Sequence, residues 1–374
     1  MIKVAINGFG RIGRSAFKIA LDPTSPLRRQ SYGASATRLR GVKDQIEIVA
    51  INDLVEPSTL AHLLQHDSAY GRWDKEVFAG TDGQSLTIDN KNYPITAEKF
   101  PANLQWKDLG VDVVLECTGR FTKEDDLRQH ILAGAKKVIL SAPAKSTSGE
   151  PGLTPEVSGV GVGVPTYLMG VNHDQYHGED VISNASCTTN CIAPVMAILQ
   201  EKFGILKAVM TTVHAVTAEQ NLVDGPPPGG KSNDLRRARA AYSNIIPTST
   251  GAAISVIEVI PELKGKFDGR ALRVPVIVGS ISDITCVVGK KTTVEEVNEV
   301  FRVASNEPRW NGIVTWSEEP LVSTDIIGRS ESAIVDLSLT QVVDGDLVKV
   351  FAWYDNECGY SNRLIEQVIN ISRK

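Results

Sequence analysis

Long apolar runs are absent from this chain of 374 residues. No run approaches the roughly 18 consecutive apolar residues that a membrane-spanning helix needs, so we expect no membrane partner. The first apolar run is broken at Asn7 and Gly8 and has no small-residue cleavage site after it, which argues against a secretory leader. Closely spaced cysteine pairs are also missing. The five cysteines are scattered, so we expect free thiols, no metal centre and a cytoplasmic protein.

A strong charge of either sign is lacking too. The chain has 39 lysines and arginines against 44 aspartates and glutamates, a formal net charge of -5, so its charge gives no reason to expect a nucleic-acid partner. Hydrophobic residues make up 42% and charged residues 22%, which is typical of globular proteins. At about 150 residues per domain, the length predicts about two domains.

The two halves of the chain differ in pattern. In the first half, short apolar runs alternate with helical stretches, which predicts a parallel sheet covered on both faces. In the second half, strands follow one another with few helices between them, which predicts a mostly antiparallel sheet with helices on one side. The expected strands are 3–6, 46–51, 111–117, 137–140 and 181–182 in the first half, and 208–213, 271–276, 281–288, 333–339 and 348–354 in the second.

A glycine pattern joins the first strand to the first helix. Gly8, Gly10 and Gly13 have the spacing that lets the backbone approach a pyrophosphate at a helix N-terminus, so we predict a dinucleotide-binding turn. Asp53, at the end of the second strand, is the expected carboxylate for a ribose hydroxyl. It lies beyond the usual spacing, which we explain by an inserted loop at 22–45. The alternative role for this aspartate is to cap the following helix.

A cysteine and a histidine form the candidate reaction centre. Cys187 begins a helical stretch, where the helix dipole lowers a thiol pKa, and His214 follows an apolar strand as the expected base. Each alone is more often a packing residue. Beside a dinucleotide site they suit one chemistry: a thiolate adds to an aldehyde, the histidine takes the hydroxyl proton as hydride leaves for the nicotinamide, and a thioester remains. Cys191, one turn later, is expected to pack inside.

Candidate anion sites lie in the second half. Arg236, Arg237 and Arg239 cluster in a loop, and residues 248–252 begin a helix with free N–H groups. Arg273 lies in an otherwise apolar strand, where an unpaired charge is costly. A phosphate would satisfy these groups. The alternatives are a solvated loop face and an internal carboxylate, and we expect at least one phosphate site.

The order of these motifs resembles the phosphorylating glyceraldehyde-3-phosphate dehydrogenase family over essentially the whole chain. AINGFGRIGR, SNASCTTNC, RRARAA, NIIPTSTGAA and RVP stand in the family's order, with YDNECGYSN near the end. The resemblance implies an α/β, Rossmann-type NAD-binding domain with a parallel sheet at 1–186, completed by the C-terminal helix 356–374. An α+β catalytic domain with a mostly antiparallel sheet follows at 187–355. It also implies NAD as cofactor, a small phosphorylated aldehyde and inorganic phosphate as substrates, a place in glycolysis and a homotetramer.

The resemblance also assigns roles to single residues. Cys187 is the nucleophile and His214 its partner. The expected cofactor contacts are Gly8, Gly10, Arg11, Ile12, Gly13, Asp53, Thr118, Gly119, Ser141 and Asn356. Inorganic phosphate is expected at Ser186, Thr188, Arg237, Thr250 and Gly251, and the phosphate of the substrate at Thr217 and Arg273.

The chain departs from the family pattern at a few places. The loops 22–45, 145–165 and 224–234 are longer. The first carries several arginines, which we interpret as a solvated face before a docking patch. Glu219 stands where many members have Asp or another small polar residue, and Cys358 replaces the Trp of the usual NEWGYS run.

Two other functions are weighed against this one. An erythrose-4-phosphate dehydrogenase, which releases the acid, is the nearest enzyme alternative, but Thr217 and the TSTGAA run resemble the glyceraldehyde-3-phosphate enzymes more. A binding or sensor protein that has lost catalysis is the other, and the presence of both Cys187 and His214 argues against it.

Overall fold

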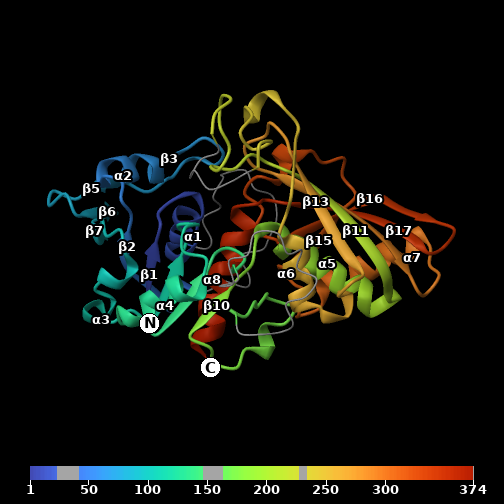
Figure 1. Cartoon of the computed structure of the whole chain (residues 1–374), viewed down its shortest axis with the longest axis horizontal. Coiled ribbons are helices and arrows are strands. Elements are labelled where there is room, and N and C mark those ends of the chain that lie inside the picture. Colours follow the sequence, from blue (N-terminus) through green and yellow to red (C-terminus); the bar gives the residue numbers. More distant parts are fainter. Residues whose placement is uncertain (23–41, 146–162, 227–233, 374) are drawn as a thin grey trace.

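The computed structural model of the chain describes residues 1–22, 42–145, 163–226 and 234–373, which form two lobes (Figure 1). Most of each predicted loop lies outside the described residues, including the arginine-rich part of 22–45. Between the lobes runs the last helix, α8 (Cys358–Ser372), which packs against helices of both.

The first lobe is built on an eight-stranded sheet in the order β10-β9-β8-β1-β2-β7-β6-β5. Its strands from β10 to β7 run parallel, and β6 and β5 add an antiparallel edge. The predicted parallel sheet is therefore confirmed, although β5, β6 and β7 were not predicted. The strands are β1 (Ile2–Asn7), β2 (Ile46–Asn52), β5 (Val77–Ala79), β6 (Ser85–Ile88), β7 (Lys91–Thr96), β8 (Val113–Glu116), β9 (Lys137–Leu140) and β10 (Val181–Ser183).

Helices cover both faces of this sheet because side chains of a buried strand alternate between two apolar layers. Val4 and Ile6 of β1 belong to the layer of α1 and α8, whereas Ala5 belongs to the layer of α3 and α4. The parallel order brings the carboxyl ends of β1, β2, β8 and β9 to one edge, where ligands of such sheets bind. The helices are α1 (Arg11–Leu21), α2 (Pro57–Gln65), α3 (Trp106–Leu109) and α4 (Glu124–Leu132), with a short hairpin of β3 (His66–Asp67) and β4 (Gly71–Arg72).

The second lobe is a seven-stranded sheet in the order β12-β13-β11-β14-β17-β16-β15. Only β11–β13 and β15–β16 are parallel pairs, so the mostly antiparallel sheet is confirmed. Helices α5 (Cys187–Phe203), α6 (Ala252–Val259) and α7 (Val294–Asn306) pack on one face. The strands are β11 (Ile205–His214), β12 (Ile246–Thr248), β13 (Phe267–Arg273), β14 (Ser280–Val288), β15 (Val314–Ser317), β16 (Ala333–Val343) and β17 (Leu347–Tyr354).

Six short 3-10 turns lie among the described residues. The turns are Val42–Asp44, Pro101–Asn103, His173–Gln175, Ala241–Ser243, Pro261–Leu263 and Ser323–Ile326. No helix in the described ranges has the length and apolarity needed to cross a membrane. In the same ranges, no three His, Cys, Asp or Glu side chains gather as a metal site.

Candidate active site

The predicted dinucleotide turn lies between β1 and α1, and two of its glycines are required by close contacts. Gly8 has a φ of +93°, and a Cβ there would lie 2.6 Å from the Thr118 nitrogen. A Cβ at Gly13 would lie 2.2 Å from the Gly8 carbonyl oxygen. Nothing lies within 4 Å of a Cβ built at Gly10, which directly precedes α1. The turn is therefore tightly packed at Gly8 and Gly13 and open at Gly10, beside the N-terminus of α1, as a pyrophosphate site requires.

Asp53 is fixed beside this turn. Its Oδ2 accepts the Phe9 N–H at 2.7 Å and its Oδ1 accepts the Val55 N–H at 3.0 Å. Helix α2 begins at Pro57 with Glu56 at its N-cap, so the alternative that Asp53 caps this helix is wrong. The carboxylate therefore lies at the carboxyl end of β2, where a ribose hydroxyl would meet it.

A second turn meets the first at the ends of β8 and β9. Thr118 and Gly119 follow β8, and the Ser141 N–H donates to the Glu116 carbonyl at 3.0 Å. The Glu116 side chain, which the sequence reasoning missed, is fully buried and accepts both the N–H and the hydroxyl of Thr118. A carboxylate two residues before a strand-end threonine was the signal that could have revealed it.

The two residues that begin α1 differ in what they offer a cofactor. Arg11 pairs with Asp67 at 2.8 Å and with Glu357 at 2.5 Å, so carboxylates already hold its guanidinium. Ile12 is half-buried and packs on the core. Here the backbone N–H groups, rather than the Arg11 side chain, suit the expected cofactor contact.

Asn356 reaches the site from the turn before α8. Its Oδ1 accepts the Gly279 N–H and the Ser280 hydroxyl, both at 3.1 Å. With Oδ1 held, Nδ2 is the atom that can donate, which suits a nicotinamide amide oxygen.

The structure brings the predicted catalytic pair together. Cys187 Sγ lies 3.4 Å from His214 Nε2, joining the first residue of α5 to the last residue of β11. Ser186 caps α5 by accepting the Thr189 N–H at 3.1 Å. The thiol is half-buried, so a substrate can approach it.

Two contacts of His214 Nδ1 bear on how the ring is protonated. Nδ1 lies 2.7 Å from the Ala215 carbonyl oxygen, which can only accept, and 2.6 Å from Arg273 Nη1, which can only donate and also donates to that carbonyl. The first contact favours a proton on Nδ1 and the second a proton on Nε2, so together they select neither tautomer. Burial and the Arg273 cation lower the pKa of His214 to about 3, so the ring is neutral at neutral pH. Burial raises the pKa of Cys187 despite Arg273 and Thr188, so the expected lowering by the helix is outweighed.

Tyr354 lies behind the pair and was not predicted. Its hydroxyl is 2.8 Å from the Thr212 hydroxyl and 3.0 Å from that of Thr188, and its ring meets His214 edge-on. The Thr188 hydroxyl is thus engaged inside the protein, which leaves its expected phosphate contact to the backbone. The tyrosine opens the YDNECGYSN run, which the sequence reasoning used only for Asn356.

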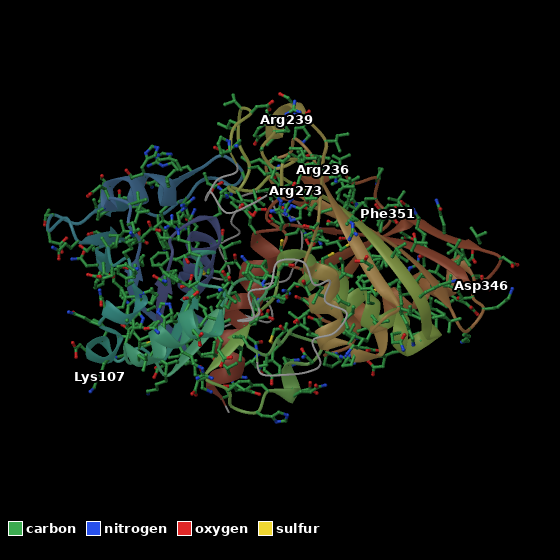
Figure 2. The ribbon with its side chains drawn as sticks, in the orientation of Figure 1. Lys107, Arg236, Arg239, Arg273, Asp346 and Phe351 are labelled. Carbon is green, nitrogen blue, oxygen red and sulfur yellow. The ribbon has the colours of Figure 1, made fainter. Side chains whose placement is uncertain are left out.

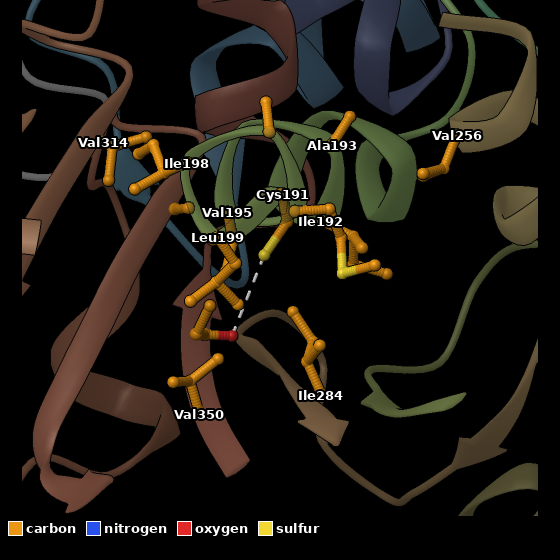
Figure 3. Close-up of a cluster of buried hydrophobic side chains, with 14 of the residues drawn as sticks. Cys191, Ile192, Ala193, Val195, Ile198, Leu199, Val256, Ile284, Val314 and Val350 are labelled. Atoms are coloured by element: carbon orange, nitrogen blue, oxygen red, sulfur yellow. Dashed lines mark hydrogen bonds between the residues drawn. The ribbon is translucent and has the colours of Figure 1, made fainter. Parts of the chain in front are cut away.

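Cys191 packs inside, as predicted. It is fully buried among apolar side chains of α5 and of the facing strands (Figure 3). Its Sγ lies 3.8 Å from the Ala352 carbonyl oxygen, the contact drawn in that figure.

The candidate anion-binding residues gather at one end of the second lobe, where Arg236, Arg239 and Arg273 are labelled in Figure 2. Glu219 Oε1 lies 2.5 Å from Arg237 Nη1 and 3.5 Å from Arg273 Nη2. A carboxylate partner for these arginines therefore exists, but its side chain is about half exposed rather than internal, and one carboxylate serves two guanidinium groups.

Hydroxyl and N–H groups accompany these arginines. Arg237 Nη2 donates to the Ser249 carbonyl at 3.4 Å, next to Thr250 and Gly251 at the start of α6. The Thr217 hydroxyl is buried without a partner among the described residues. An unpaired buried hydroxyl is costly, so a ligand oxygen beside Thr217 would relieve it.

A dinucleotide turn and a thiol–imidazole pair on the two lobes of one chain define a nicotinamide-dependent dehydrogenase of the kind that attacks an aldehyde through cysteine. Residues 2–124 match the glyceraldehyde 3-phosphate dehydrogenase NAD binding domain, and residues 186–356 match the C-terminal domain of the same enzymes. The chain belongs to the glyceraldehyde-3-phosphate dehydrogenase family.

Similar proteins in bacteria carry the same description. The glyceraldehyde-3-phosphate dehydrogenase of Geobacillus stearothermophilus is 46% identical over 375 residues, covering 100% of this chain and 99% of the relative. The proteins of that name from Bacillus subtilis (numbered 1) and Streptomyces coelicolor are each 45% identical, with the same coverage. The cofactor of the family domain at 2–124 is NAD.

Proposed function

We propose that the chain oxidises D-glyceraldehyde 3-phosphate with NAD and inorganic phosphate to 1,3-bisphosphoglycerate, through a thioester on Cys187. The observation that carries this is the 3.4 Å approach of Cys187 Sγ to His214 Nε2, with Arg237 and Arg273 nearby around Glu219. The names of the full-length relatives support it, and none favours erythrose 4-phosphate as substrate.

NAD would lie on the turn of Gly8, Gly10 and Gly13, with Asp53 at the ribose and Asn356 at the nicotinamide amide. Thr118, Gly119 and Ser141 would line the same edge of the sheet. Once bound, NAD supplies the hydride acceptor that no side chain can provide.

The protein residues perform the remaining steps. His214 Nε2 accepts the thiol proton, Sγ adds to the aldehyde carbon, and Nε2 returns that proton to the carbonyl oxygen, which gives a hemithioacetal. The same nitrogen, again unprotonated, then takes the hydroxyl proton as the C–H bond breaks and hydride leaves for the nicotinamide, so that a thioester remains on Cys187. A phosphate oxygen attacks the thioester carbon, and the C–S bond breaks to return the thiolate.

The anion-binding residues divide into two sets. Arg273 contacts His214 at 2.6 Å, and Thr217 follows His214 by three residues in the chain, so we assign these two to the phosphate of the substrate. Ser186, Thr188, Arg237, Thr250 and Gly251 are assigned to the inorganic phosphate. Before phosphates bind, the Glu219 carboxylate pairs with the guanidinium groups of Arg237 and Arg273, and the phosphates then replace it.

Omitting phosphate is expected to stop turnover after about one equivalent of reduced cofactor per Cys187, because the thioester then has no acceptor. Reduced cofactor is measured by absorbance after rapid mixing with aldehyde and NAD. Continued turnover without phosphate would instead indicate hydrolysis of the thioester, as in an erythrose-4-phosphate dehydrogenase.

Arg237→Ala is expected to raise the KM for phosphate by about tenfold or more, since a hydrogen-bonded charge is removed. Arg273→Ala should raise the KM for the aldehyde instead. Arg239→Ala, from the same loop but paired with Asp224, is the control and should change neither. If both Arg237→Ala and Arg273→Ala weaken only aldehyde use, the two phosphate sites are assigned wrongly.

Asp53 should make the enzyme prefer NAD to NADP. A 2′-phosphate about 4 Å from the carboxylate would be repelled by about 4 kcal/mol at an effective dielectric of 20, before screening. Even about 1.4 kcal/mol corresponds to tenfold, so kcat/KM should favour NAD at least about tenfold. Asp53→Ala should lose NAD efficiency and gain relatively with NADP. Equal efficiency of the unaltered chain with both cofactors would contradict this role.

The proposal includes a division of the chain into two domains, one of residues 1–186 with 356–374 and one of residues 187–355. The two sheets and the helix between them support this division. The five free thiols suit the reducing cytoplasm.

Self-association as a homotetramer is supported by the face of the second sheet that no helix of the described residues covers. Val287, Leu347 and Val343 pair across neighbouring strands on that face, and Val209 and Phe351 lie on the same face. Light scattering of the purified chain tests it: the expected mass is four times 40.4 kDa, and a monomer or a dimer would contradict it.

A further inference from the structure

The turn that carries Asn356 is held by the residue before it. Asp355 is almost fully buried, and its carboxylate accepts the N–H groups of Glu357 at 2.9 Å and Cys358 at 2.8 Å. These two bonds close the turn locally. It also accepts the Gly328 N–H at 2.7 Å and the Tyr70 hydroxyl at 2.9 Å. Tyr70 is the one donor among these that comes from the first lobe.

Glu357, on the other side of Asn356, leads to the dinucleotide turn. Its carboxylate holds Arg11 through both oxygens, at 2.6 Å to Nε and 2.5 Å to Nη2. Arg11 also pairs with Asp67, whose Oδ1 accepts the Tyr70 N–H at 3.1 Å. The residue after Asn356 therefore binds Arg11, the first residue of α1, directly. The residue before it reaches Arg11 through Tyr70 and Asp67.

Apolar packing places Tyr70 at the same point. Its ring belongs to a small separate buried cluster with Ala69, Val278, Ile327 and Cys358. Val278 directly precedes Gly279, whose N–H holds Asn356 Oδ1. Cys358 lies two residues after Asn356, so this cluster packs against the same turn.

We propose that Tyr70 is a positioning residue, which acts through Asp355 to hold Asn356 at the nicotinamide amide. The proposal rests on the proposed function, in which Asn356 binds that amide. The amide is the group that distinguishes one face of the nicotinamide ring from the other, so a fixed Asn356 presents one face to the aldehyde. Hydrogen bonds weaken steeply with distance and angle, so a small shift of the turn loosens this choice. Burial and Glu357 raise the pKa of Asp355 to about 6, which still leaves a carboxylate to accept the Tyr70 hydroxyl at neutral pH.

Tyr70→Phe tests the proposal, because it removes one hydroxyl and keeps the ring beside Arg11. Dissociation constants are measured by calorimetry for NAD and for ADP-ribose, which lacks the nicotinamide. We expect the constant for NAD to rise by about tenfold and that for ADP-ribose by less than about twofold. With NAD deuterated at C4, hydride should add to the opposite face in a measurable fraction of turnovers, which places the deuterium in the other prochiral position of the reduced cofactor.

The matched control is Tyr167→Phe. The Tyr167 hydroxyl donates to the Glu179 carboxylate at 2.7 Å, so the same kind of bond is lost outside the proposed cofactor site. It should leave both dissociation constants unchanged. Equal weakening of NAD and ADP-ribose by Tyr70→Phe, or no weakening of either, would overturn the proposal.

A double-mutant cycle separates positioning from general destabilisation. If Tyr70 acts through Asn356, Asn356→Ala alone should weaken NAD, and adding Tyr70→Phe should weaken it no further. Fully additive losses would show that Tyr70 acts by another route. Failure of the unaltered chain to bind NAD would contradict the proposed function itself, which distinguishes the two failures.

Discussion

Cys187→Ser is expected to lower aldehyde oxidation by about 10⁴-fold or more while NAD binds almost as tightly as before. A hydroxyl is far less acidic than a thiol, and His214 is too weak a base to generate the alkoxide. The cofactor site lies on other elements, so its affinity should not follow the loss. Steady-state rates and NAD titration of the same preparation measure the two quantities.

Cys191→Ser is the control for this loss. The same atom is exchanged one helical turn away, but Cys191 Sγ faces the Ala352 carbonyl inside the core. A hydroxyl in that apolar layer should lower the unfolding temperature and leave kcat close to its original value. Near-normal oxidation by the Cys187→Ser chain would rule out covalent catalysis at this residue.

The fold was predictable wherever burial set a clear pattern. Strand 137–140 was placed to the residue, because it is a compact apolar segment that ends at small polar residues. Strand 271–276 was placed too late, since β13 spans Phe267–Arg273 and Pro275 cannot donate to a ladder. The strands β5, β6 and β7 escaped prediction because β6 and β7 mix polar with apolar residues and β5 is only three residues long, so none stands out as an apolar run.

The candidate site was predictable where one residue type does the chemistry. The glycines, Asp53, Cys187 and His214 can each be inferred from the needs of a dinucleotide or a thioester. Glu116, Tyr354 and Tyr70 could not be inferred in this way, because they act through a neighbour and any buried tyrosine or carboxylate resembles them in sequence. The sequence also gave no indication that Glu219 would span Arg237 and Arg273, since only the fold brings those three together.

His214→Asn is expected to slow the oxidation step by about 10²- to 10⁴-fold, the usual contribution of a general base. Asparagine can still donate to the Ala215 carbonyl, so the substitution removes the base and keeps the local hydrogen bond. The fold should therefore survive, which is checked by an unchanged NAD dissociation constant. The rate is measured in a single turnover, where release of products does not limit it.

Alkylation of Cys187 by iodoacetamide isolates the role of His214 from the rest of the reaction. The pKa of His214 is lowered to about 3, so the ring is neutral at neutral pH, and burial raises the pKa of the Cys187 thiol, so the ring can take the thiol proton only transiently as Sγ attacks. The asparagine variant lacks that acceptor and must wait for a thiolate formed by solvent. It should thus react more slowly at pH 7, and the difference should shrink as the pH approaches the raised pKa of the Cys187 thiol, where the thiolate forms without a base. An equal rate at neutral pH in both proteins would show that His214 does not take the thiol proton, and the base would then have to be sought elsewhere around Cys187.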